Sequence, residues 1–172
     1  MANYCPIQNL AGISYSCENS MGGIKKVLMA SYVEDAYDVD ATNGVISGVT
    51  SAATFYDYAL RKNTSDYGFE TQGENGNKSY VTTVNLKFPK MDAAKRLELD
   101  KLSKGDILVI VVDNNGKYWA LGKDTAASLA VSGGSGTATT DANEFTAVIT
   151  SESLDIPYPL SDAGISSITL SA

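Results

Sequence analysis

The feature that most restricts the fold of this chain is the alternation of side chains over residues 79–88. Residues of one parity are mostly apolar or aromatic and those of the other are mostly polar; the first set is Tyr80, Thr82, Val84, Leu86 and Phe88. In a β-strand successive side chains point to opposite faces, so this pattern predicts a strand with one buried face. A chain built on such strands has to pair them in sheets.

Residues 54–62 and 67–72 continue the β pattern, and residues 73–78 (GENGNK) have the composition of a turn. We therefore predict a long antiparallel hairpin or meander over residues 54–88, with a polar, glycine-rich tip. Residues 24–33 are apolar on both parities, which predicts a strand that is covered on both faces.

A second hairpin is predicted over residues 106–122 (DILVIVVDNNGKYWALG). Asn115-Gly116 fits a two-residue type I′ turn between its strands. Residues 144–152 alternate again, with Phe145, Ala147 and Ile149 on one face.

One helix is predicted, over residues 91–104. Pro89 ends the preceding strand, Asp92 suits the first turn, and Lys101 and Lys104 suit the last turn. Gly105 supplies the stop.

The remaining segments are predicted to be irregular. Residues 1–23 form an N-terminal arm, residues 34–43 an acidic loop and residues 132–139 a flexible loop, while residues 156–172 form either a C-terminal arm or an edge strand. The sum is one mainly β domain over residues 24–155, a small β-sandwich or barrel with one flanking α-helix and extended loops and arms.

The composition argues against an enzyme. The chain has no histidine, which is the commonest general base and metal ligand near neutral pH. Acidic pairs such as Glu98 and Asp100 are better explained as solvated surface groups, and residues 38–44 depart from the calcium-loop pattern. We expect no catalytic residue, no cofactor and no metal site. Cys5 and Cys17 are compatible with a disulfide or with free thiols.

The net charge of −7 disfavours tight binding of nucleic acid, although an acidic wall would let DNA pass without adhering. Tyrosine is suited to protein interfaces, and the chain has ten. Residues in the predicted hairpin are our candidates for contacts between subunits: Tyr67, Phe69, Glu70, Glu74, Asn75, Asn77 and Tyr80.

The order of these parts resembles the tail tube proteins of tailed bacteriophages. The resemblance covers roughly residues 24–155 and depends on the hairpin 54–88, the helix 91–104, the hairpin 106–122, the loop that reaches Asp141 and the strand EFTAVITSES. These are ordinary β-hairpin motifs, and no single residue is diagnostic.

The resemblance implies hexameric rings whose inner sheets join into one continuous β-barrel, stacked into a tube by long loops and terminal arms. The partners would be other copies of the chain, further tail proteins, and genomic DNA that passes through an acidic lumen during ejection. The localisation would be the virion tail, after synthesis in the host bacterial cytoplasm. The first ten residues lack a basic start followed by an apolar run, so we expect neither a leader nor a membrane anchor.

Two alternatives remain open. One is another virion protein, such as a head-decoration protein, a connector or a tail-terminator ring. The other is a β-sandwich carbohydrate-binding module, in which Tyr56, Tyr58 and Trp119 would form an aromatic row.

Overall fold

The described residues form three β-sheets and two helices. The computed structural model describes residue 7 and residues 10–172. The strands are β1 (Ile24–Ser31), β2 (Tyr37–Asp40), β3 (Val45–Val49), β4 (Thr54–Ala59), β5 (Asp66–Glu74), β6 (Asn77–Pro89), β7 (Ile107–Asp113), β8 (Tyr118–Leu121), β9 (Ser128–Gly134), β10 (Glu144–Ser153), β11 (Tyr158–Pro159) and β12 (Thr169–Leu170). The helices are α1 (Ala93–Lys104) and α2 (Asp162–Ser166). The predicted fold class, a small mainly β domain with a flanking helix, is confirmed.

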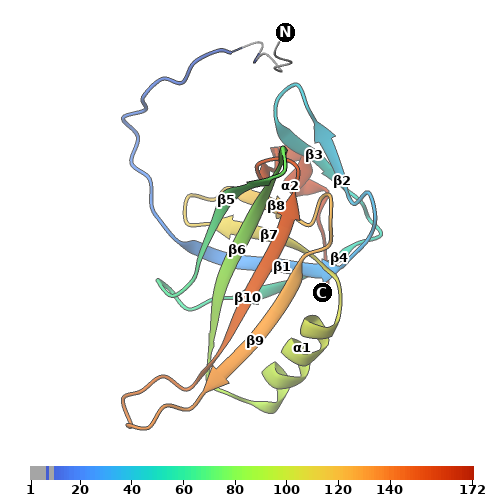
Figure 1. Ribbon diagram of the computed structural model, residues 1–172. Helices are drawn as coiled ribbons and strands as arrows, with labels where there is room; N and C mark the ends of the chain where they lie inside the picture. The colour runs from blue at the N-terminus through green and yellow to red at the C-terminus, as the bar shows by residue number, and fades with distance from the viewer. Residues whose placement is uncertain (1–6, 8–9) are drawn as a thin grey trace.

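A six-stranded sheet, in the order β11-β8-β7-β1-β4-β12, forms the middle of the molecule. A four-stranded antiparallel sheet, β5-β6-β10-β9, packs on one of its faces, and its strands run across those of the central sheet (Figure 1). The small β2-β3 sheet and α2 cover the other face, so the molecule has three layers.

The central strand β1 shows why the middle sheet is buried on both faces. Val27 and Met29 point into the core shared with the four-stranded sheet and α1. Leu28 and Ala30 point into the second core, below β2, β3 and α2. All four side chains are at most 2% exposed, which confirms the strand predicted to be covered on both faces.

The helix α1 confirms the predicted helix and begins two residues later. The Asp92 carboxylate accepts a hydrogen bond from the Lys95 backbone N–H at 2.8 Å, which caps the first turn. Lys101 and Lys104 lie in the last turn, and the Gly105 N–H bonds to the Leu102 carbonyl. Leu99 is the one buried side chain of the helix, and it packs into the first core.

The predicted hairpin over residues 54–88 is wrong in its first strand. β4 belongs to the central sheet and pairs with β1, whereas β5 and β6 form the hairpin in the four-stranded sheet. Phe55 explains the placement of β4, because its side chain is fully buried in the second core. Alternation predicts which residues lie on one face of a strand, but it does not choose the neighbouring strand.

The predicted type I′ turn at Asn115-Gly116 is also wrong. Only Gly116 has a positive φ there, and Asp113 pairs with Lys117, so the loop has the three-residue form that ends in a left-handed glycine. The type I′ geometry occurs at the other hairpin, where Asn75 and Gly76 both have a positive φ (52° and 82°) and Glu74 pairs with Asn77.

Regular structure also lies in segments predicted to be irregular. β2 occupies part of the predicted acidic loop because Tyr37 is buried while Asp38 faces solvent. β9 includes Gly133 and Gly134, which the sequence assigned to a flexible loop. A Cβ on Gly133 would lie 3.1 Å from Cδ1 of Phe145, so the absence of a side chain here allows the aromatic ring to pack and does not indicate a flexible loop.

The C-terminal segment, for which an arm or an edge strand was predicted, contributes two edge strands of the central sheet and the helix α2 between them. β11 pairs with β8 at one edge, and β12 runs parallel to β4 at the other. The helix α2, whose first turn is capped by the Ser161 hydroxyl, was not predicted from the sequence.

Candidate interaction surface

The seven predicted contact residues lie on one hairpin, but they occupy three different places. Asn75 forms the tip, between Glu74 and Asn77, while Glu70 points to the solvent side of the sheet. The aromatic side chains of Tyr67, Phe69 and Tyr80 are on the opposite side, which faces the central sheet.

Tyr67 differs from the other six because it packs against the first core. Its ring lies 6.0 Å from that of Trp119, centroid to centroid. Burial, with a smaller effect from the Asp113 carboxylate, raises the pKa of Tyr67 to about 12. Phe69, two residues later, is 46% exposed because the hairpin extends past the central sheet.

No described residue covers the outer face of the four-stranded sheet. We use this name for the side chains that point away from the central sheet, and none of them is buried. Most of them are polar or acidic, and the register places them in cross-strand rows: Asp66, Gly68, Glu70, Gln72 and Glu74 on β5; Ser79, Val81, Thr83, Asn85 and Lys87 on β6; Glu144, Thr146, Val148, Thr150 and Glu152 on β10; Ser128, Ala130 and Ser132 on β9.

The charge of the outer face is negative. Its carboxylates are Asp66, Glu70, Glu74, Glu144 and Glu152, and its cation is Lys87, whose Nζ lies 3.2 Å from a Glu144 oxygen. The row through Val81 has Glu70 on one side and Glu152 on the other. An uncovered sheet face that combines hydroxyls with excess carboxylates disfavours contact with an anionic polymer.

Both edges of the four-stranded sheet are unpaired within the described residues. β5 and β9 are the edge strands, and their residues beyond Tyr67 and Leu129 are exposed. Long edge strands of this kind offer rows of free N–H and C=O groups to another strand.

The turn geometry shows which backbone groups of β5 are free. In a two-residue hairpin the flanking pair, here Glu74 and Asn77, is hydrogen-bonded, and bonded pairs then alternate along the strands. It follows that Phe69, Thr71 and Gly73 direct their backbone groups away from β6, toward the open edge.

The N-terminal arm is anchored at its base by the β7–β8 loop. The Asn115 carboxamide accepts from the Met21 N–H and donates to the Met21 carbonyl, both at 2.8 Å, and the Asn114 amide donates to the Gly22 carbonyl at 2.6 Å. This role of Asn114 and Asn115 was not predicted from the sequence, where the turn alone accounts for them. A side-chain carboxamide offers the same donor and acceptor as a backbone peptide group, but nothing in the sequence indicates which residue it will bond.

Residues 10–20, which precede that anchor, form no helix or strand and extend from the body of the molecule (Figure 1). The apolar side chains of this segment are exposed to solvent. The exposed fraction is at least 80% for each of Leu10, Ile13 and Tyr15. Cys17 is also exposed, whereas Cys5 lies outside the described residues.

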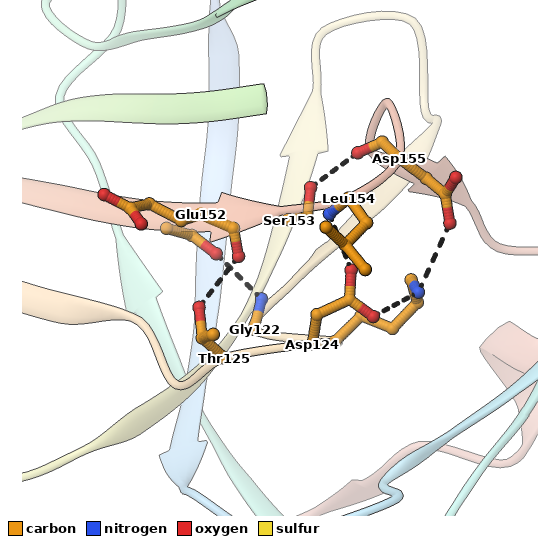
Figure 2. Close-up of polar contacts among 9 residues, drawn as sticks. Gly122, Asp124, Thr125, Glu152, Ser153, Leu154 and Asp155 are labelled. Carbon is orange, nitrogen blue, oxygen red and sulfur yellow. Dashed lines mark hydrogen bonds and ion pairs between the residues drawn. The ribbon is translucent and has the colours of Figure 1, made fainter. Parts of the chain in front are cut away.

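A polar cluster joins the end of β10 to the β8–β9 loop, where the chain leaves the four-stranded sheet (Figure 2). The Asp124 carboxylate accepts from the Leu154 N–H at 2.8 Å, and the Thr125 hydroxyl donates to the Glu152 carbonyl at 2.8 Å. Lys123 contacts both Asp124 and Asp155. Burial alone lowers the pKa of Lys123, but the Asp124 hydrogen bond and the two carboxylate charges outweigh it and raise that pKa. The cluster fixes the two sheets relative to each other at this end.

The aromatic residues considered for carbohydrate binding do not form one exposed row. Tyr58 donates a hydrogen bond to Glu98 of α1 at 2.7 Å, and Trp119 donates to Asp113 at 3.2 Å and packs on Tyr67. Of these three aromatic residues, Tyr56 alone is more than half exposed.

The described residues contain no group of three or more potential metal-binding side chains. In the turn at residues 38–44, Asp40 uses its carboxylate to accept from the N–H groups of Thr42 and Asn43. These bonds close the acidic turn that leads into β3.

No protein-family model matches the chain, and no curated protein matches its sequence. In the part of the chain that the structure describes, no helix is both long and apolar enough to cross a membrane.

Proposed function

We propose that this chain is a structural virion protein whose copies join edge to edge into rings, and that the rings stack into a phage tail tube. The observation that carries the proposal is the four-stranded sheet, whose acidic face is uncovered and whose two edges are unpaired in the part of the chain that the structure describes. A sheet with these properties has the parts of a closed barrel that is built from several copies.

The two edge strands, β5 and β9, would form the contact between neighbouring copies in a ring. Pairing β5 of one copy with β9 of the next is a head-to-tail contact, and a rotation that closes gives a ring without free edges. Each new backbone hydrogen bond contributes roughly 1 kcal/mol net, so a few bonds per contact are sufficient when a ring contains several such contacts.

The outer face supplies the lining. In a closed ring this face would enclose the lumen, and its carboxylates would be repeated by every copy. Like charges repel phosphates over roughly 8–10 Å at physiological salt, so DNA would pass without adhering. The hairpin tip around Asn75 and the exposed arm would contact the next ring.

A single substitution tests the edge contact without disturbing the subunit. Thr71 directs its N–H away from β6, so Thr71→Pro removes a donor from the free edge and keeps the β5–β6 ladder intact. We expect a folded monomer that forms neither rings nor tubes in electron micrographs, while the matched Thr71→Val variant assembles. Assembly of Thr71→Pro at the wild-type level would show that the β5 edge is not the contact.

The same images test the neighbouring alternative. Single rings that do not stack would favour a connector or tail-terminator role, because the edge contact would be present and the axial contact absent.

A further inference from the structure

The chain contains three Asn-Gly pairs, all exposed and all in turns: Asn43-Gly44, Asn75-Gly76 and Asn115-Gly116. Asn-Gly is the dipeptide most open to deamidation, because the glycine leaves the following backbone nitrogen free to approach the side-chain carboxamide. The reaction needs that nitrogen and the carboxamide to be unengaged. The three sites differ in this respect.

Two of the sites are held by hydrogen bonds. The Asn43 carboxamide donates to Asp40 at 2.7 Å, and the Gly44 N–H donates to the Asp40 carbonyl at 2.8 Å. The Asn115 carboxamide is bonded twice to Met21, and the Gly116 N–H donates to the Asp113 carbonyl at 3.1 Å. At both sites the attacking nitrogen and the amide under attack are restrained.

Asn75 is different on both counts. Within the described residues its carboxamide forms no hydrogen bond, and in the type I′ turn the Gly76 N–H points to solvent. A Cβ placed on Gly76 would meet nothing within 4 Å, so the tip has open space around the reacting atoms.

We propose that Asn75 is a site of spontaneous deamidation in the folded subunit, and that this modification limits how long a free subunit stays competent to assemble. The Gly76 nitrogen attacks Cγ of Asn75, and the Cγ–N bond breaks. Ammonia leaves and takes up the proton from the Gly76 nitrogen. Water then opens the succinimide to aspartate or isoaspartate.

Either product places a carboxylate beside Glu74 at the hairpin tip, and isoaspartate also adds a backbone carbon to a two-residue turn that has no slack. The consequence for assembly rests on the proposed function, which places this tip at the next ring. The chemistry itself does not.

The first experiment follows the three sites in unassembled protein by peptide mass spectrometry during storage in mildly alkaline buffer. In the folded protein we expect Asn75 to lose its amide at least about tenfold faster than Asn43 and Asn115, because each restraining bond has to open first. In urea the three rates should converge, since all three are Asn-Gly pairs. Equal rates at the three sites in the folded protein would overturn the proposal.

The second experiment compares assembly of fresh, aged and Asn75→Asp subunits. Aged and Asn75→Asp protein should form fewer and shorter tubes than fresh protein, while both melt as folded monomers. If aged and Asn75→Asp subunits assemble as well as fresh subunits, deamidation of Asn75 does not limit assembly. If fresh wild-type protein forms no particle of any kind, the proposed function fails, but the difference between the three deamidation rates is still measurable.

Discussion

The packing of α2 against the second core gives the sharpest prediction about stability. Gly164 is buried where the helix crosses β3, and a Cβ at this position would lie 2.4 Å from the Ile46 carbonyl oxygen. That oxygen cannot move freely, because it accepts from the backbone N–H of Ser161 at 3.0 Å and from the Ser161 hydroxyl at 3.2 Å. Gly164→Ala therefore forces α2 away from β3.

Two effects of opposite sign compete in Gly164→Ala. Alanine in place of glycine inside a helix gains at most about 1 kcal/mol, and less in a helix as short as α2. Overpacking against fixed backbone costs about 1–3 kcal/mol. The net loss is about 1–2 kcal/mol, which lowers Tm by roughly 2–8 °C for a chain of this length.

Thermal melting followed by circular dichroism measures this difference. The control is Ser166→Ala in the same helix, an exposed position where alanine gains propensity and meets no such contact. We expect its Tm to equal or slightly exceed that of the wild type. If Gly164→Ala melts at or above the wild type, the packing argument for α2 is wrong.

Three further predictions concern other parts of the molecule. Leu99→Ala should cost about 2–5 kcal/mol in chemical denaturation, because it empties the buried contact of α1, whereas Leu97→Ala on the exposed side should stay within about 0.5 kcal/mol; equal losses would refute this orientation of the helix. Asn115→Ala should release the arm, seen as faster hydrogen exchange at Met21 with Tm nearly unchanged, and unaltered exchange would contradict the anchor. The raised pKa of Tyr67 means that its contribution to stability is complete below about pH 10 and is lost between about pH 10 and 12. Tyr67→Phe should therefore lose less stability over that interval than the wild type. If the free energies of unfolding of the two proteins fall in parallel between about pH 10 and 12, the loss does not come from ionisation of Tyr67.

The parts of the fold that the sequence predicted are those governed by local periodicity. The buried alternation of β6 and β10, the double burial of β1 and the capped helix α1 all depend on residues within one segment. The choice of partner strand does not, and β4 was therefore assigned to the wrong sheet. Whether Phe55 packs on one sheet or the other is decided by residues far away in the chain.

Glycine and asparagine were the least informative residues in the sequence, because one residue type has several uses. Asn115 anchors the arm, Asn75 forms the true type I′ turn, and Gly133 makes room for Phe145. The seven residues predicted as subunit contacts lie on the β5–β6 hairpin, and their role as contacts stays a prediction. The acidic outer face could not be foreseen, because it is formed by four strands whose register appears only in the folded sheet.

The central claim is that other copies of this chain complete the open edges of the four-stranded sheet. Sedimentation of concentrated protein, with electron microscopy of the same sample, shows whether these edges pair. We expect closed rings or tubes whose formation is lost in Thr71→Pro and retained in Thr71→Val. A protein that stays strictly monomeric at high concentration, with no larger particle in the images, would contradict it.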